Sequence, residues 1–424
     1  MIALSIVLIV LAVFGAPLFT VIAGSAMLGY YQEEIDLMAV AIEILGIANM
    51  PFLSAIPLFT FAGYLLSESN APKRLVRLTG ALLGWMPGGL ALVSLAACAF
   101  FTAFTGASGV TIIALGAILY PALKQDGYPD NFNLGLVTTS GSLGLLFAPS
   151  LPLILYGVIA EVPIDDLFRA GILPGMLMLV MLSGYSLWVS RGNRQPLKPF
   201  SFRELGGALR ESMWELPLPV VVLGGIYSGF FAVSEAAAVT ALYVLIVEVF
   251  VLREITFRQL PEVMRQSMLL VGGILVILGV SLASTNYMID AGVPQVLLAF
   301  VAELVSSELS FLLLLLLFLL ILGAILDIFS AIVLVVPLVL PIAAQYGVNE
   351  THLGIVFLAA MQLGYLTPPV GLNLFITSYR FNKPIMQVYA ATLPFLLILM
   401  VSVLIITFWQ DLSLWFLPGQ DAAP

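Results

Sequence analysis

The chain has 424 residues, of which 61% are hydrophobic and only 9% are charged. Soluble domains carry about 25% charged residues, so this composition excludes a water-soluble fold and predicts a membrane protein. The net charge of −9 offers no basic face for nucleic acid, and the single cysteine excludes an internal disulfide. The longest polar stretch, Arg191 to Glu215, leaves no room for a soluble catalytic domain. We therefore expect an all-α polytopic membrane protein that is not an enzyme.

Positively charged residues predict the topology, because cytoplasmic loops of membrane proteins collect Lys and Arg. The apolar segment 1–19 has no basic start and is expected to be a retained membrane helix. Fourteen of the fifteen Lys and Arg fall in five loops, and only Arg169 lies apart. The five loops are 73–77, 124, 191–210, 253–265 and 380–383. With all five in the cytoplasm, the further expected spans are 132–159, 170–189, 214–231, 233–252, 267–289 and 352–378.

Two apolar stretches do not fit this topology as complete spans. Between Arg77 and Lys124, and again between Asp290 and Glu350, the chain must enter and leave the membrane on one side. Each stretch holds two legs of about 15 to 17 residues, which are short for a hydrocarbon core of about 30 Å. We therefore predict two opposed re-entrant hairpins, the first entering from the cytoplasm and the second from outside.

The two hairpin regions align with a constant offset of 220 residues. The matched pairs are Pro121 and Pro341, Gln125 and Gln345, Gly127 and Gly347, Gly144 and Gly364, Pro149 and Pro369, and Pro174 and Pro394. Coincidental matches of Gly and Pro in an apolar chain are the alternative explanation. Together with the opposed hairpins, the constant register predicts an inverted repeat.

Each predicted repeat ends in a helix that cannot continue without a break. The segments 135–157 and 354–378 both carry internal Gly and Pro, and each Pro removes a helical hydrogen bond. Paired breaks of this kind are typical of transporter sites, where half-helix N-termini attract anions and freed carbonyls bind Na⁺. Neither segment contains Lys or Arg. Amide N–H groups, hydroxyls and bound cations would therefore have to hold an anion.

Four motifs resemble those of a known family: "LTPPVGLNLF" from Leu366, "SEAAAVTALY" from Ser234, "APSLPLILYG" from Ala148 and "GAILDIFSAIVLVVPLVLP" from Gly323. With the closing "DLSLWFLP", they resemble the large membrane subunit of tripartite ATP-independent periplasmic (TRAP) transporters, the DctM-like family of the ion-transporter superfamily. The tip "TGASG", residues 105–109, departs from the family pattern but keeps its hydroxyls.

The resemblance implies an elevator-type fold, in which a transport domain with two hairpins slides against a scaffold held by arm helices. The expected units are 1–87 (scaffold helices and first arm), 88–190 (first transport repeat), 191–306 (second arm and scaffold), 307–412 (second transport repeat) and 413–424 (polar tail). The resemblance also implies uptake of a small organic anion across the bacterial inner membrane, with Na⁺ as coupling ion and no other cofactor. The implied partners are a small four-helix membrane subunit and a periplasmic substrate-binding protein.

The predicted symmetry suggests two Na⁺ sites, each joining a hairpin tip to a helix break. The first would comprise Thr105, Gly106, Ser108, Ser140 and Gly141, with Ser142 beside them. The second would comprise Asp327, Ser330, Gly364, Thr367 and Pro368. The candidate substrate ligands are Ser108, Ser142, Thr367 and Asn373. The alternatives are that these small residues only allow close helix packing, and that Asp327 only caps the helix that follows it.

Two other functions are compatible with parts of the sequence. A stand-alone Na⁺/dicarboxylate symporter of the same superfamily would carry the same breaks but need no binding protein. An intramembrane serine protease could use the G-x-S-G run at 106–109, with Ser108 as nucleophile and His352, the single histidine, as base. The expected topology places that histidine and Ser108 at different depths, which argues against a dyad.

Overall fold

The computed structural model describes residues 7–8, 10–11, 14, 16–47, 50, 53–191 and 199–417. Within these residues every regular element is a helix, in agreement with the predicted all-α class. The membrane helix expected over residues 1–19 falls largely outside them. By length and apolar composition, five of the described helices could cross a membrane, or up to eight if each bent pair is one span. The chain is therefore a multi-pass membrane protein.

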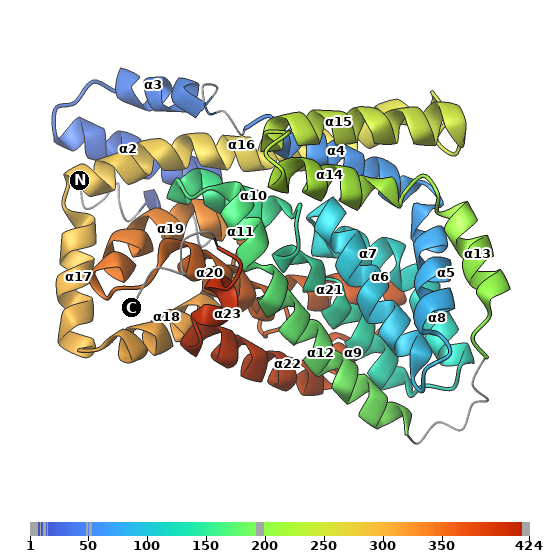
Figure 1. Cartoon of the computed structure of the whole chain (residues 1–424). Coiled ribbons are helices and arrows are strands. Elements are labelled where there is room, and N and C mark those ends of the chain that lie inside the picture. The colour runs from blue at the N-terminus through green and yellow to red at the C-terminus, as the bar shows by residue number, and fades with distance from the viewer. Residues whose placement is uncertain are drawn as a thin grey trace.

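Six helices form a layer along one side of the molecule, at the top of Figure 1. They are α2 (Leu18–Gln32), α3 (Met38–Gly46), α4 (Ala55–Glu68), α14 (Pro217–Tyr227), α15 (Val233–Leu245) and α16 (Leu260–Asp290). α16 packs against α2, α3 and α4, and α15 packs against α4 and α14. α15 continues into a π-helical turn, η3 (Ile246–Val251).

Three shorter helices run across the direction of this layer (Figure 1). α5 (Ala71–Leu83) and α13 (Phe202–Glu211) pack on each other at one end, and α17 (Val293–Leu304) lies at the other. Arg77 of α5 pairs with Glu204 at 2.8 Å and with Glu211, both on α13. α17 bends by 113° into the helix that follows it. The three helices fall within 1–87 and 191–306, the ranges in which arms are expected, and their role as arms stays a prediction.

The remaining helices form a second group, below the layer in Figure 1. The first half contains α6 (Gly89–Thr105), α7 (Ser108–Ala114), α8 (Gly116–Gln125), α9 (Asp130–Ser140), η2 (Leu143–Leu146), α10 (Leu151–Ala160), α11 (Ile164–Ala170) and α12 (Ile172–Ser190). The second half contains α18 (Glu308–Gly323), α19 (Ile328–Gln345), α20 (Glu350–Gly364), α21 (Leu372–Phe381), α22 (Ile385–Phe408) and α23 (Asp411–Leu414). α20 is buried from residue 351 to 364, which makes it a central helix of this group.

Helix bounds in the two halves recur at the same offset of 220 residues. The second hairpin legs cover 108–125 and 328–345, and the next helices start at Asp130 and Glu350. Gly127 and Gly347 both turn the chain with a φ near +80° (81° and 79°). The Ala148–Pro149 and Pro368–Pro369 peptide bonds are both cis. That one half is inverted relative to the other stays a prediction.

The first hairpin legs have the expected length, and the second legs are slightly longer. α6 has 17 residues and α18 has 16, but α19 has 18 and is long enough by itself to cross a membrane. The other second leg is bent by 49° between α7 and α8. Length alone therefore does not show whether a leg is re-entrant or spans the membrane. The contacts that the two tips make are more informative about how the hairpins are placed.

Candidate functional site at the helix breaks

The first hairpin turns at a glycine that no other residue could replace without strain. α6 ends at Thr105, Gly106 adopts φ +64°, and α7 begins two residues later at Ser108. Only glycine adopts this left-handed conformation freely. A Cβ on Gly106 would also lie 2.5 Å from Cγ of Leu151, the first residue of α10. The tip is thus folded tightly against the helix that follows the first break.

The first hairpin lies against the first break, and Thr102, which was not singled out from the sequence, makes the hydrogen bond between them. Thr102 Oγ1 donates to the Gly141 carbonyl at 2.9 Å and is 2.7 Å from Thr111 Oγ1. Thr105 Oγ1 lies 3.5 Å from the same Thr111 oxygen. A Cβ on Gly144 would meet the carbonyl oxygen of Ala99 at 2.3 Å. The leg and the broken helix therefore touch through their backbones.

The predicted residues of the first site are all enclosed. Thr105, Ser140 and Ser142 are fully buried, and Ser108 is 4% exposed. Ser140 Oγ donates to the Val137 carbonyl at 3.4 Å, and Ser142 Oγ donates to that of Thr139 at 3.3 Å. Their protons are thus used within the helix, which leaves the hydroxyl oxygens as acceptors for a cation or a donor.

Asn373 connects the two halves of the molecule. It is fully buried near the N-terminus of α21. Ser108 Oγ donates to Asn373 Oδ1 at 2.7 Å, and Asn373 Nδ2 donates to the Thr138 carbonyl at 3.3 Å. The second broken helix therefore reaches both the first tip and the first break. Two predicted substrate ligands, Ser108 and Asn373, are brought into direct contact.

The second tip begins with a capped helix. Asp327 Oδ1 accepts hydrogen bonds from the amides of Phe329 and Ser330 at 3.0 and 3.1 Å. Its Oδ2 accepts from the Ser330 hydroxyl at 2.5 Å. The capping role considered for Asp327 is therefore present. The carboxylate is exposed, so a role as a cation ligand is compatible with this geometry.

The second tip is likewise held against its own break. The Gly371 amide donates to the Ala324 carbonyl at 3.2 Å, and the Ile328 amide donates to the Tyr365 hydroxyl at 2.7 Å. A Cβ on Gly364 would lie 2.5 Å from Cα of Gly323, so the two helices cross at backbone contact. Thr367 is half-buried, and its hydroxyl donates a hydrogen bond to the Leu363 carbonyl at 3.1 Å. Pro368 is exposed. The second site is thus more open than the first.

Several buried polar atoms at the broken helices have no hydrogen-bond partner among the described residues. They are Thr139 Oγ1, Ser150 Oγ, both amide atoms of Gln362, and Thr377 Oγ1. Thr377 lies four residues after Asn373, on the same face of α21. Gln362, a polar side chain two residues before Gly364, was not singled out from the sequence. Buried polar groups usually find partners, so these atoms are the places where a bound ion, water or solute would bond.

The protease alternative is wrong in this structure. Both ring nitrogens of His352 are engaged elsewhere, Nδ1 at 3.2 Å from Ser413 Oγ and Nε2 at 3.3 Å from the Thr407 carbonyl oxygen. The Ser108 hydroxyl donates to Asn373. A nucleophile and its base must lie within hydrogen-bond reach, and these two residues do not.

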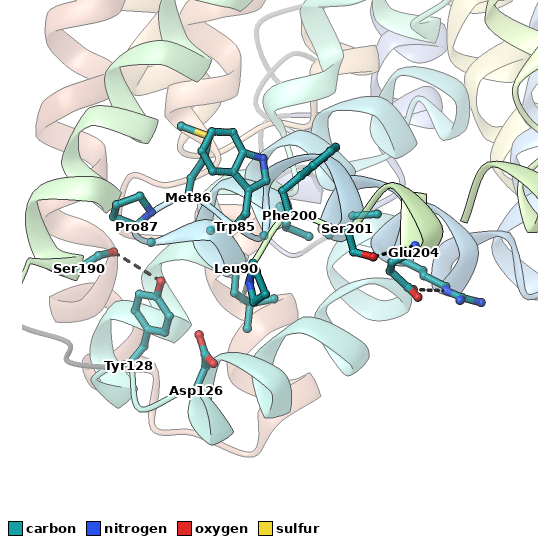
Figure 2. A pocket seen from close by; sticks show the side chains of 18 of the residues that line it. Trp85, Met86, Pro87, Leu90, Asp126, Tyr128, Ser190, Phe200, Ser201 and Glu204 are labelled. Carbon is teal, nitrogen blue, oxygen red and sulfur yellow. Dashed lines mark hydrogen bonds and ion pairs between the residues drawn. The ribbon is translucent and has the colours of Figure 1, made fainter. Parts of the chain in front are cut away.

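A cavity of about 660 Å³ is lined by residues that belong to neither tip. Figure 2 shows its walls from close by. Its walls come from the end of α5, the start of α6 and the end of α12, and include Trp85, Gly88, Tyr128 and Ser190. Ser190 Oγ donates to the Tyr128 hydroxyl at 3.4 Å, as Figure 2 shows. None of the predicted ligands lines it, so we do not assign the solute site to this cavity.

An all-helical membrane chain with two hairpin tips on two broken helices has the architecture of a membrane transporter. The fold is similar to that of the YdaH transporter of Alcanivorax borkumensis, with a TM-score of 0.61 and 13% identity over 88% of this chain and 87% of that one. The family model described as "Tripartite ATP-independent periplasmic transporter, DctM component" matches residues 3–412. The chain belongs to this family of TRAP large permeases, which confirms the resemblance found in the sequence.

Two relatives illustrate the range of the family. The C4-dicarboxylate TRAP transporter large permease protein DctM of Pseudomonas aeruginosa is 34% identical, over 89% of this chain and 88% of that protein. The isethionate TRAP transporter permease protein DctMQ of Oleidesulfovibrio alaskensis is 33% identical, over 95% of this chain and 62% of that protein. Both are named as transporter permeases, and neither name describes an enzyme.

Proposed function

We propose that this chain is the membrane subunit through which a TRAP transporter takes up a small organic acid together with Na⁺. A periplasmic binding protein would deliver the acid to the bacterial inner membrane. The observation that carries the proposal is the Ser108–Asn373–Thr138 bridge, which brings the first tip and both broken helices to one point. A solute bound there would contact both halves of the chain.

The site suits an anion accompanied by cations. α10 and α21 begin directly after the breaks, and the N-terminus of a helix attracts a bound anion. The breaks also free carbonyl oxygens, which Na⁺ prefers together with hydroxyls. Among the described residues, no group of three His, Cys, Asp or Glu side chains could hold a metal ion. A site of backbone carbonyls and hydroxyls matches a weakly bound coupling ion.

The relatives support a small acid as the solute class. Their names include a C4-dicarboxylate and isethionate, which carry carboxylate and sulfonate groups respectively. A cluster of amides and hydroxyls accepts either oxyanion without a fixed positive charge. Selection among acids would then rest with the binding protein rather than with this chain.

The arrangement of helices supports an elevator movement. The crosswise helices α5, α13 and α17 lie at the two ends of the α2–α4 and α14–α16 layer, where arms would frame a moving domain (Figure 1). The first leg of each hairpin touches its own broken helix through backbone contacts at Gly144 and Gly364. Hairpins and broken helices would therefore move as one body against the layer.

The DctMQ relative supports a small membrane subunit as partner. This chain covers 62% of that relative, which leaves length for a second membrane part fused to the first. We propose that a small membrane subunit packs on the exposed apolar side chains of the α2–α4 and α14–α16 layer. Met38, Ile42 and Leu45 on α3 are each more than 60% exposed.

Reconstitution tests the tripartite function against the stand-alone symporter. Proteoliposomes holding this chain with its small subunit should take up the acid only with an inward Na⁺ gradient and the loaded binding protein outside. The matched control replaces Na⁺ with K⁺ at equal ionic strength. Full uptake from free acid without the binding protein would contradict the proposal and favour a stand-alone symporter.

A second prediction separates ion binding by Asp327 from helix capping. Asn349 caps α20 in the same way, accepting from the amides of Thr351 and His352 at 2.9 and 3.2 Å. Asp327→Ala and Asn349→Ala should each cost about 1 kcal/mol of stability through the lost cap. Only Asp327→Ala should also raise the Na⁺ concentration for half-maximal uptake, by about tenfold. Equal Na⁺ dependence in both variants would leave Asp327 as a cap alone.

A further inference from the structure

Three carboxylates surround one arginine where the α5 arm meets the α14–α15 layer. Arg74 of α5 donates through Nε to Glu215 Oε1 at 2.6 Å and through Nη1 to Glu254. Glu248 Oε1 lies 3.5 Å from Arg74 Nη2, which is also 2.5 Å from Glu215 Oε1. If all three acids were ionised, the group would hold two negative charges in excess.

The excess charge cannot be dispersed into water. The side chains of Arg74 and Glu215 are 11% exposed, that of Glu254 is 16% exposed, and that of Glu248 is 1% exposed. Both oxygens of Glu248 and Oε2 of Glu215 are buried without a hydrogen-bond partner among the described residues. An ionised carboxylate left unpaired in such a place is strongly unfavourable.

Glu254 differs from the other two acids because both of its carboxylate oxygens accept hydrogen bonds. Glu254 accepts from Arg74 and, at 2.6 Å, from the Asn70 amide. Burial opposes its ionisation, but these hydrogen bonds hold the pKa of Glu254 below its ordinary value. Arg74 also binds Glu215, but only through Oε1, and Glu215 Oε2 has no partner among the described residues. Glu254 is therefore fully satisfied as an ionised carboxylate, whereas Glu215 and Glu248 both approach Arg74 Nη2 and keep unpartnered oxygens.

We propose that Glu215 and Glu248 form a proton-binding carboxyl pair that holds one proton between them and fastens the arm to the layer. The proton would supply a donor for one of the three unpartnered oxygens and remove one excess charge. Two carboxylates that share a site commonly retain one proton in this way. On ionisation the O–H bond breaks, and the proton leaves to the water that reaches the edge of the group at Glu254.

Among the described residues, two hydroxyls near the pair donate their protons elsewhere. The Ser69 hydroxyl faces Glu248, but its proton goes to the Leu66 carbonyl at 3.0 Å. The Tyr243 hydroxyl donates to the Trp214 carbonyl at 2.8 Å. The other titratable groups on the α4 helix that packs against α15 are Tyr64 and Glu68. Glu248 itself lies in the π-helical turn, a geometry frequent at functional sites.

The direction in which stability changes with pH follows from the numbers of protons that the folded and unfolded chains bind. The folded chain would hold a proton that the unfolded chain releases at neutral pH, so stability falls as pH rises. Glu248→Gln replaces a protonated carboxyl with a neutral amide of nearly the same shape. This variant should match the wild-type melting temperature at pH 7 within about 2 °C and should not share its decline toward pH 9.

Glu254→Gln is the matched control. The glutamine side chain would place an N–H donor against the backbone N–H of Asn70, and it would lack the negative charge that pairs with Arg74. It should lower the melting temperature by about 4 °C or more at every pH between 6 and 9. The full-length chain in detergent would serve for both measurements. A wild-type melting temperature that is flat across this range would overturn the proposal, as would a Glu248→Gln loss at pH 7 equal to that of Glu254→Gln.

Infrared spectroscopy in D₂O gives a readout independent of melting. The wild type at pH 7 should show a protonated-carboxyl band that Glu248→Gln lacks and that Glu254→Gln keeps. Should Glu248→Gln not fold, Glu215→Gln serves as the second variant, because it removes the other member of the pair. A bound cation is the alternative to a bound proton. If replacing choline with Na⁺ or K⁺ raised the melting temperature of the wild type but not of the variants, the proposal would be overturned.

Discussion

Gly364→Ala should strongly disrupt the transporter, because the added methyl group would collide with a helix backbone. A Cβ there would meet Gly323 at 2.5 Å from Cα and 2.6 Å from the carbonyl carbon. Both atoms belong to a helix backbone, so neither can swing aside as a side chain would. Overpacking of this kind costs about 1–3 kcal/mol or more. We expect a lowered melting temperature in detergent and uptake reduced by at least about tenfold.

Gly184→Ala on α12 is the control for Gly364→Ala. No atom lies within 4 Å of a Cβ at Gly184, and alanine favours a helix by about 1 kcal/mol over glycine. Its melting temperature should stay level or rise. If Gly364→Ala behaved like Gly184→Ala, the backbone crossing of α18 and α20 would not be a tight contact. Gly144→Ala extends the test to the first half, where Ala99 O would lie 2.3 Å away.

Replacing Asn373 with leucine should also have a large effect. The change leaves the Ser108 hydroxyl and the Thr138 carbonyl without partners in a fully buried place. Each such loss costs about 1–3 kcal/mol. Uptake should fall more than about tenfold, with a lower melting temperature. Asn131→Leu is the control, because Asn131 is exposed and accepts a single bond from Gln387 at 3.1 Å.

A double variant distinguishes a bridge from a substrate ligand at Asn373. If Asn373 fastens the first tip, Ser108→Ala and Asn373→Leu together should cost less than the two single changes added, by about 0.5–3 kcal/mol. If Asn373 acts only on the substrate, the half-saturating acid concentration should rise while the melting temperature stays unchanged. That second outcome would contradict the structural role of the bridge.

The sequence predicted the features that depend on local chemistry. The tip at Gly106 and the breaks at Pro149 and Pro369 follow from what glycine and proline do to a backbone, so they could be located without neighbours. The family could also be recognised, since motifs such as that from Leu366 to Phe375 are contiguous. The recurrence of helix ends at an offset of 220 residues agrees with the pairs read from Gly and Pro.

The contacts between distant segments could not be predicted. Ser108 and Asn373 are 265 residues apart, and nothing in either local sequence indicates that one donates to the other. Thr102 lies inside an apolar leg, where a threonine ordinarily bonds to its own helix, yet it donates to Gly141. Gln362 is read as an ordinary polar residue until its burial is known. Such pairings depend on how whole helices pack.

The two glycines that bound α6 also limit how this hairpin can change in length. Gly88 precedes the helix with φ +73° and Gly106 follows it with φ +64°, so both ends are fixed by left-handed turns. Each residue of an α-helix advances the side-chain direction by about 100°. A single-residue insertion or deletion within α6 would therefore turn the tip away from Gly141 and Asn373. Natural variants of this chain should accept substitutions along α6 but keep its count of 17 residues.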